Sequence, residues 1–318
     1  MKRIWVTGEA LIDFIPGEIA GRQAFVPCCG GSTFNAAKAA ALQGAPVSFI
    51  GAISTDMFGD QLAADLSADG VDVSMAPRSD APSTLAFVSY EGPEPRYAFF
   101  NRQSATQMTD MSQLSCEIRS GDILHLGSIS LVENPGADSI AKFALAQDPN
   151  VLVSFDPNVR ESIISDREDW LRRFEMLLAR SALLKLSDDD LQYIAPDVSP
   201  KAFARTCLDG GAALVVVTLG QDGMIAETRE GSVHVPANRN LVGDTVGAGD
   251  TVMGVLMAEL VLNQRTSHAA LSSLKGESLR SLVERAAAAA WLNCQSVGCR
   301  PPDRTAVNAF LEEGLNAV

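Results

Sequence analysis

Short apolar runs, rich in β-branched residues, alternate with helical stretches along most of the chain. The apolar runs predict strands at residues 4–7, 47–53, 123–126, 151–155, 183–186 and 214–218. The stretches between them predict helices at residues 33–43, 60–68, 137–147, 170–180, 247–262 and 279–295. Because the strands are apolar on both faces and separated by helices, we expect a mostly parallel sheet between two helix layers.

Two segments, residues 14–27 and 84–102, break this rhythm. Both are extended and rich in proline, glycine and aromatic residues, and apolar and polar residues alternate from 84 to 90. This pattern fits a small β-sheet that projects from the main layer. The sequence contains no internal repeat, low-complexity tract or long linker. We therefore expect a single α/β domain over residues 1–318 with an inserted small sheet.

The composition is that of a folded, acidic protein. With 318 residues, of which 47% are hydrophobic, the chain can bury a substantial core, and this excludes intrinsic disorder. The formal net charge of -14 repels polyphosphate backbones and acidic membrane surfaces. We therefore expect no nucleic-acid or membrane partner, although local donors can still bind a small nucleotide.

The cysteines and the N-terminus indicate a cytoplasmic protein. The six cysteines lack C-x-x-C spacing, and the adjacent Cys28 and Cys29 would form a disulfide only with strain, so we expect reduced thiols. Glu9 and Asp13 interrupt any apolar signal region, and no apolar run approaches the ~20 residues that span a bilayer. The three histidines form no metal-ligand spacing.

Residues 243–251, Gly-Asp-Thr-Val-Gly-Ala-Gly-Asp-Thr, form a glycine-rich turn at the start of a predicted helix. Glycine lets the backbone around Gly247, Ala248 and Gly249 expose consecutive N–H groups, and the helix start adds a partial charge of roughly +0.5. Together these features make an anion cradle. Asp250 beside this cradle is explained if its carboxylate removes a proton from a hydroxyl that attacks a bound phosphate. The alternative is a turn that only joins a strand to a helix.

Polar residues follow two predicted strands at the end where parallel sheets bind ligands. Asp13 follows the first strand, and its carboxylate can accept from two neighbouring hydroxyls; the alternative is a solvated loop aspartate. Residues 156–160 read Asp-Pro-Asn-Val-Arg, in which Asn158 and Arg160 can face a phosphate or a sugar. The alternative there is an Asx turn with a surface arginine. Arg102 is a weaker candidate, because an exposed arginine is usually just solvated.

A glycine pair precedes the first predicted helix. Gly30 and Gly31 let a ligand approach the backbone, and Asn35 offers both a donor and an acceptor in the first turn. The alternative is ordinary helix-entry chemistry with Ser32 or Thr33 as the N-cap, and both descriptions can hold together.

Two further turns follow predicted strands. Residues 185–190 read Lys-Leu-Ser-Asp-Asp-Asp, whose three acids suit the positive first turn of a helix. Residues 217–223 close another strand with a glycine-bounded turn, which would be an ordinary hairpin if it stood alone.

These motifs together resemble the ribokinase-like (PfkB) sugar kinases. The resemblance rests on Asp-Thr-x-Gly-Ala-Gly-Asp-Thr at residues 244–251 and Gly-Gly-x-x-x-Asn at residues 30–35, and it runs over nearly the whole chain. It implies a ribokinase-like three-layer α/β/α sandwich with a small β-sheet lid, which covers the sugar and clasps the lid of a second protomer in a homodimer. The implied reaction transfers the γ-phosphate of ATP, with Mg²⁺, to a primary hydroxyl of a small sugar, with Asp250 as general base.

The resemblance also implies roles for single residues. The implied sugar contacts are Asp13, Gly30, Gly31, Asn35, Arg102, Arg160 and Asp250. The implied ATP contacts are Lys185, Ser187, Thr218, Gly220, Gly223, Gly247, Gly249 and Asn293. Gly247, Ala248 and Gly249 would also steady the moving phosphoryl group, and K⁺ is an optional activator near Asp244 and Val246. The family's Asn-x-x-Glu pattern is Ser187 and Asp190 here, so the shorter Asp190 is expected to reach Mg²⁺ through a bound water.

The acceptor sugar is only partly defined by this resemblance. Residues 156–160 look most like the bacterial fructokinase branch, which implies conversion of D-fructose to fructose 6-phosphate. The alternatives within the class are 2-keto-3-deoxygluconate kinase, ribokinase and aminoimidazole riboside kinase. Outside it, the chain could be a catalytically silent sugar sensor or a nucleoside-binding protein. A Ser-His-Asp hydrolase is not favoured, because the sequence has no G-x-S-x-G elbow.

Overall fold

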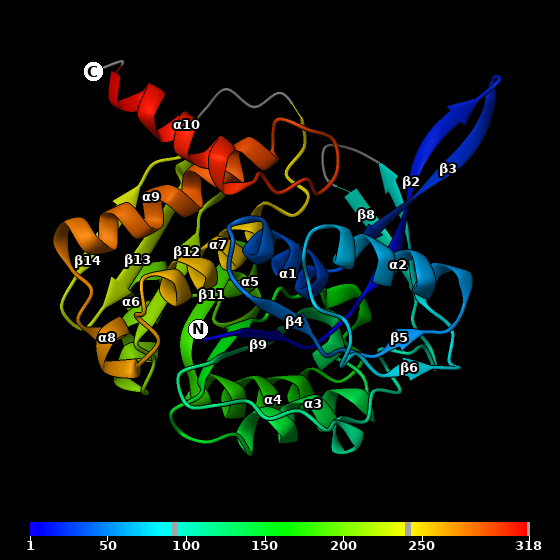
Figure 1. The fold of residues 1–318 in the computed structure, drawn as a ribbon, viewed down its shortest axis with the longest axis horizontal. Helices are drawn as coiled ribbons and strands as arrows, with labels where there is room; N and C mark the ends of the chain where they lie inside the picture. Colours follow the sequence, from blue (N-terminus) through cyan, green and yellow to red (C-terminus); the bar gives the residue numbers. More distant parts are fainter. Residues whose placement is uncertain (91–94, 239–242, 317–318) are drawn as a thin grey trace.

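The largest element of the structure, a computed structural model that describes residues 1–90, 95–238 and 243–316, is an eight-stranded sheet (Figure 1). Its strands, in spatial order, are β14 (Ser232–Val235), β13 (Met224–Thr228), β12 (Leu214–Thr218), β11 (Ser181–Ser187), β10 (Leu152–Asp156), β9 (Ile123–Gly127), β1 (Ile4–Val6) and β4 (Val47–Phe49). The pairings from β12 to β4 are parallel, and those of β13 are antiparallel. The mostly parallel sheet predicted from the sequence is therefore confirmed.

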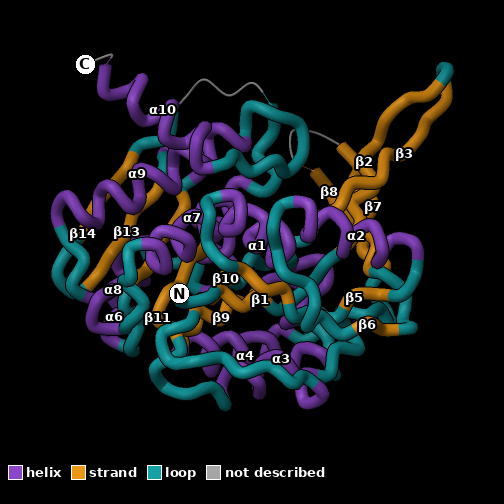
Figure 2. The backbone as a smooth tube through the Cα atoms, in the orientation of Figure 1, coloured by secondary structure: helices purple, strands orange, loops and turns teal. Residues whose placement is uncertain are grey.

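Helices cover both faces of this sheet (Figure 2). One hydrophobic cluster joins the sheet to α1 (Ser32–Leu42), α2 (Met57–Ala68), α7 (Ala248–Leu262), α8 (His268–Ser272), α9 (Gly276–Asn293) and α10 (Arg304–Asn316). A second cluster joins the other face to α3 (Gly136–Leu145), α4 (Arg167–Arg180), α5 (Asp188–Ile194) and α6 (Pro200–Asp209). Two separate cores, one on each face, are the signature of a three-layer α/β/α sandwich.

The two irregular segments form a separate four-stranded sheet, as the sequence predicts. Its order is β3 (Arg22–Gly30), β2 (Leu11–Ile19), β7 (Thr84–Tyr90) and β8 (Pro95–Phe100). The β2–β3 hairpin extends away from the main body at the right of Figure 1. We call this sheet the lid. Its inner face packs Leu11 and Ala86 against Ile129, which lies in the 3₁₀ turn Ser128–Leu131 after β9.

The prediction of one strand at residues 47–53 is wrong. β4 ends at Phe49, and β5 (Ile53–Ser54) instead pairs with β6 (Arg78–Ser79) in a small two-stranded sheet. The chain turns at Gly51, whose α-carbon packs so closely against the Gly8 carbonyl that a side chain would overlap it. Glycine here allows a close approach of two loops and ends the strand.

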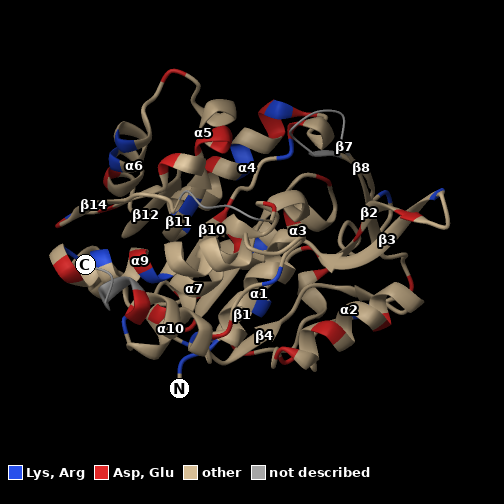
Figure 3. Cartoon of the chain, turned by 90° about the horizontal axis from the view of Figure 1, so that it is seen from above, with Lys and Arg blue, Asp and Glu red and all other residues tan. Residues whose placement is uncertain are grey.

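Acidic residues lie on the surface of the molecule as well as in its interior. Figure 3 shows acidic positions along α2 and at the start of α5, where Asp188, Asp189 and Asp190 follow one another. In the part of the chain that the structure describes, we find no helix with the length and apolar character needed to cross a membrane.

Candidate active site

Asp250 lies in the first turn of α7 and is only 7% exposed. Its Oδ1 accepts a hydrogen bond from the Ser32 hydroxyl at 2.7 Å, and its Oδ2 accepts one from Asn35 Nδ2 at 2.9 Å. Both donors come from the first turn of α1, far away in the sequence. The carboxylate is therefore fixed in orientation by a pair of donors.

A close contact between the two helices makes these hydrogen bonds possible. A Cβ at Gly254 of α7 would lie 2.5 Å from Ala39 Cβ and 2.6 Å from the Ala36 carbonyl oxygen of α1. Small residues on both helices let the backbones approach until the first turns meet. The alternative, that Ser32 or Thr33 caps this helix, is wrong: Gly31 occupies the cap position without a side-chain bond, and the Ser32 hydroxyl donates to Asp250.

The glycine-rich turn before Asp250 has the geometry of an anion cradle. Gly247 is left-handed, with φ of 73°, and a side chain there would overlap the Cys299 thiol. A Cβ at Gly249 would lie 2.6 Å from the Lys185 ammonium. The left-handed backbone thus favours glycine at 247, and the Lys185 ammonium leaves little room for a side chain at 249. The Ala248 N–H donates to the Thr245 carbonyl at 3.1 Å, whereas the Gly249 and Asp250 N–H groups open the helix, where no earlier helical carbonyl faces them.

The lid brings Asp13 to the same place. A Cβ at Gly30 would overlap Asp13 Oδ2, so the glycine makes room for this carboxylate between β2 and β3. Burial raises the pKa of Asp13 to about 7, with a further contribution from Asp250 and an opposing one from Arg160. The structure therefore brings together Asp13, Gly30, Asn35, Arg160 and Asp250, which come from four separate segments.

Glu9 was not among the residues that the sequence singled out, but it belongs to this cluster. It is 1% exposed, and its Oε1 accepts the Ser32 N–H at 2.8 Å, which anchors the start of α1. Gly31, with φ of 109°, packs against the Glu9 backbone. Burial raises the pKa of Glu9 to about 7. Its position directly after the first buried strand is the signal that could have found it.

An ion pair lies buried beside the glycine-rich turn. Lys185 Nζ is 2.8 Å from Asp156 Oδ2, and the two side chains are 4% and 1% exposed. Burial opposes the charge of Lys185, but Asp156, Asp190 and Asp250 outweigh it and raise its pKa. Burial raises the pKa of Asp250 as well, and the positive charge of Lys185 is the strongest influence that opposes this rise. Lys185 thus favours the ionised form of Asp250.

Ser187 and Asp190 form a capping box at the start of α5. Ser187 Oγ accepts the Asp190 N–H at 3.0 Å, and Asp190 Oδ2 accepts the Ser187 N–H at 2.8 Å. The other oxygen of Asp190 accepts the Val159 N–H at 2.6 Å. Both oxygens of the expected metal-binding residue therefore already bind backbone N–H groups.

Asn293, which the resemblance assigns to the nucleotide, lies inside the protein beside the glycine-rich turn. Its side chain is fully buried, with Nδ2 donating to the Val246 carbonyl at 2.8 Å and Oδ1 accepting the Arg300 N–H at 2.8 Å. The carboxylate of Asp244 likewise accepts the N–H groups of Val246 and Gly298, each at 2.9 Å. Asn293 and Asp244 thus fasten the glycine-rich turn to the segment between α9 and α10.

The remaining predicted residues lie at the edges of this region. Thr218 ends β12, and Gly220 and Gly223 lie in the turn that joins it to the antiparallel β13. Arg102 is exposed in the loop after β8, and no hydrogen bond or ion pair of the described residues joins it to Asp13 or Asp250. Across the described ranges, no three His, Cys, Asp or Glu side chains converge as a protein metal site requires.

Comparisons with known proteins agree on one family. Residues 1–306 match the family model described as pfkB family carbohydrate kinase. A fructokinase of Rhizobium leguminosarum bv. trifolii is 34% identical over 275 residues, which cover 86% of this chain and 84% of the relative.

Two solved structures have the same fold over almost their whole length. A fructokinase from Xylella fastidiosa with bound ATP has a TM-score of 0.89 at 29% identity, covering 98% of this chain and 99% of that one. A fructokinase from Vibrio cholerae O395 in a fructose-, ADP- and calcium-bound form has a TM-score of 0.85 at 26% identity, with the same coverage.

Proposed function

The chain belongs to the pfkB family of carbohydrate kinases, and we propose that it transfers the γ-phosphate of ATP to D-fructose, giving fructose 6-phosphate. The observation that carries this proposal is the Asp250 carboxylate, oriented by Ser32 and Asn35 beside the left-handed Gly247. A base and an anion cradle in adjacent turns suit an alcohol attacking a phosphoryl group. The fructokinase relatives support fructose as the acceptor.

In the proposed mechanism, Asp250 removes the proton from the primary hydroxyl while the oxygen attacks the γ-phosphorus of ATP. The bond from this phosphorus to the β,γ-bridging oxygen breaks, and ADP leaves. Charge that develops on the moving phosphoryl group is stabilised by the N–H groups around Gly247, Ala248 and Gly249 at the positive end of α7. A positioned base of this kind contributes ~10²–10⁴-fold to the rate.

The sugar would lie between the lid and the first turn of α1. We assign Asp13, Gly30, Gly31 and Asn35 to its hydroxyls, since they surround Asp250 on the side of the lid. Arg160 would contact the sugar or the transferred phosphate. Its positive charge opposes the rise in the pKa of both Asp13 and Asp250. We retain Arg102 as a contact that would require movement of the lid.

ATP would bind along the edge formed by Lys185, Ser187, the β12–β13 turn with Thr218, Gly220 and Gly223, and the glycine-rich turn. Mg²⁺ supplies neutralisation of the phosphate charge, and it commonly keeps several waters while it binds substrate phosphates. A largely hydrated Mg²⁺ fits this site, because both oxygens of Asp190 already accept backbone N–H groups. We propose K⁺ as an activator near Asp244 and Val246, which a comparison of rates in K⁺ and Na⁺ would test.

We further propose that the protein is a homodimer held by the lid. Phe14 and Phe87 stack with ring centroids 4.7 Å apart on the outer face of the lid, and Phe25 and Phe100 extend this face while 45% and 63% exposed. An aromatic surface of this kind is typical of a protein interface. We also propose that residues 1–318 form one domain and that the enzyme is cytoplasmic, where ATP is supplied and its six cysteines stay reduced.

A panel of acceptors in a coupled ADP assay tests the substrate. D-fructose is expected to give the highest kcat/KM among fructose, 2-keto-3-deoxygluconate, ribose and aminoimidazole riboside. A higher value for another sugar would move the proposal to that kinase. Sugar binding without ADP release from any member would indicate a silent sensor.

A further inference from the structure

Asn158 is held in an unfavourable backbone conformation beside Asp250. Its φ is 36°, which lies in the left-handed region that non-glycine residues rarely adopt. From this position its Nδ2 donates to Asp250 Oδ1 at 3.3 Å. A strained residue persists only where its surroundings hold it in place, and such residues cluster at functional sites.

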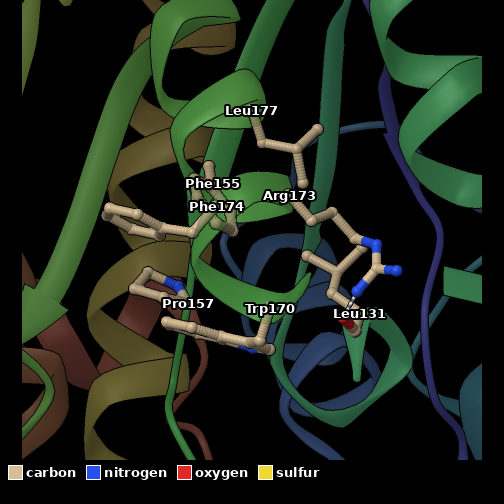
Figure 4. A pocket seen from close by; sticks show the side chains of 7 residues that line it. All are labelled: Leu131, Phe155, Pro157, Trp170, Arg173, Phe174 and Leu177. Carbon is tan, nitrogen blue, oxygen red and sulfur yellow. Dashed lines mark hydrogen bonds between the residues drawn. The ribbon is translucent and has the colours of Figure 1, made fainter. Parts of the chain in front are cut away.

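The residue before Asn158 is anchored on an aromatic wall. Figure 4 shows Pro157 beside Trp170 and Phe174, with which it lines a small pocket behind the loop. Trp170 and Phe174 of α4 stack with ring centroids 5.6 Å apart and an interplanar angle of 12°. This wall fixes one end of the loop that carries Asn158.

The residue after Asn158 is anchored by Asp190. The Val159 N–H donates to Asp190 Oδ1 at 2.6 Å, and Asp190 is itself 4% exposed and locked in the capping box with Ser187. The Val159 N–H belongs to the peptide group that directly follows the Asn158 α-carbon. A carboxylate fixed at the start of α5 therefore sets the backbone of Asn158.

We propose that Asp190 is a positioning residue that holds Asn158, and with it Arg160, against Asp250, and that it is not a ligand of Mg²⁺. Without the carboxylate, the Val159 N–H loses its acceptor and Asn158 can relax out of the left-handed region. The amide of Asn158 and the charge of Arg160 would then leave Asp250. Both groups favour its ionised form, so their loss raises the pH that Asp250 needs to act as a base.

The charged groups around Asp250 allow this effect to be assigned to the loop. Those that face it are Glu9 after β1, Asp13 on β2, Asp156 on β10, Arg160 after β10, Lys185 on β11 and Cys299 before α10. Among these, only Arg160 lies on the loop that Asp190 anchors through Val159. The charge of Asp190 also acts on Lys185 and Asp156, but loss of a negative neighbour does not disfavour an ionised carboxylate. A rise of the acid limb on loss of Asp190 therefore reports movement of residues 158–160.

The test compares Asp190→Asn with Asp189→Asn. Asp189 lies in the same turn, is exposed, and loses the same charge. In Asp190→Asn, one amide cannot accept both N–H groups. We expect the acid limb of the plot of kcat/KM against pH to move up by about half a pH unit or more. We also expect kcat to fall about tenfold, because the catalytic groups are misplaced. The Mg²⁺ concentration for half-maximal rate stays unchanged, and Asp189→Asn behaves as the native protein.

A second variant separates positioning from loss of stability. Asn158→Ala leaves the capping box intact and is expected to shift the same acid limb. The double variant Asn158→Ala/Asp190→Asn should lose no more kcat than the more impaired single variant, because Asp190 acts through Asn158. Additive losses, an unmoved limb in Asn158→Ala, or a tenfold higher Mg²⁺ requirement in Asp190→Asn would each overturn the inference.

The inference rests on the proposed role of Asp250, and the outcomes distinguish the two. An inactive Asp250→Asn together with a native-like Asp190→Asn would refute the positioning role alone. Full activity of Asp250→Asn would refute both the role of Asp250 as the base and the positioning role of Asp190.

Discussion

Lys185 and Asp156 form an ion pair of 2.8 Å that is buried next to the backbone of the anion cradle. Taking two charges out of water is costly, and a pair of this kind is retained where its charge serves a purpose or its geometry is well satisfied. Asp156 Oδ1 has no hydrogen-bond partner among the described residues, so the geometry alone does not account for the pair. The position of Lys185 beside Asp250 supplies a purpose, since it favours the ionised base.

Replacing the lysine should therefore change the pH dependence of the reaction. Lys185→Met removes the strongest influence that opposes the rise in the Asp250 pKa. We expect the acid limb of kcat/KM to move up by about one pH unit or more. Lys201→Met, which removes a half-exposed lysine of α6, is the matched control. An acid limb that stays in place in Lys185→Met would show that this charge does not govern Asp250.

Loss of the base itself should abolish most turnover. Asp250→Asn keeps the shape of the side chain and an acceptor for Ser32 or Asn35, so the fold is expected to remain intact. We expect kcat to fall ~10²–10⁴-fold while much of the ATP affinity is kept. Single-turnover rates and equilibrium ATP binding measure the two effects separately. A native kcat would show that another group removes the proton.

The contact between α1 and α7 should affect both the stability of the protein and its turnover, although it touches no substrate. A methyl group added by Gly254→Ala would meet Ala39 Cβ at 2.5 Å and force the helices apart. We expect a loss of about 1–3 kcal/mol in the free energy of unfolding, because overpacked contacts cost this much. A fall in kcat should accompany it as Ser32 and Asn35 withdraw from Asp250. Gly210→Ala, where a Cβ meets its nearest atoms at 3.4 Å in an ordinary helical conformation, should do neither.

The sequence predicted the layers because hydrophobic periodicity is a local property. Buried strands and helices can be predicted from apolar runs such as residues 214–218, which form β12 as expected. Elements with short or mixed patterns were missed, among them β14 with its alternating burial and α6 after the Ser199-Pro200 start. The break between β4 and β5 depends on Gly51 meeting Gly8 in space, which no local pattern encodes.

The candidate site was predictable only in part, for a similar reason. The residue types at strand ends pointed to Asp13, Asn35 and Asp250, and the structure gathers them. The direction of a side chain depends on partners from elsewhere in the chain. Asn293 braces the glycine-rich turn and Glu9 anchors Ser32 through contacts that their neighbours in the sequence do not reveal.

Disrupting the outer face of the lid should separate the proposed dimer. Phe100→Lys places a charge on a surface where Phe100 is 63% exposed and packs against Phe87. We expect the molar mass from light scattering to fall from that of two chains to that of one. Met176→Lys changes an exposed apolar residue of α4, outside the lid, and should leave the mass unchanged. A native chain that is already monomeric would rule out the dimer.

Glu9 should make the protein less stable as the pH rises. Its pKa is raised by burial from 4.5 to about 7, so the folded state holds a proton that the unfolded state has already released between these values. Because the folded state binds more protons in this window, the free energy of unfolding falls as the pH increases through it. Below pH 4.5 the contribution is fully present, and above about 7 it has been lost.

Glu9→Gln should remove this pH dependence, because glutamine keeps an acceptor for the Ser32 N–H and carries no charge. The difference in the free energy of unfolding between the variant and the native protein, measured by urea titration, is expected to move in favour of the variant from pH 4.5 to pH 8. The change should reach roughly 3 kcal/mol, since one pKa unit corresponds to about 1.4 kcal/mol. Glu277→Gln, which removes an exposed carboxylate at the start of α9, provides the matched control. A constant difference for Glu9→Gln as well would mean that Glu9 is ionised in the folded protein throughout this range, and that its contact with Ser32 is made by a carboxylate.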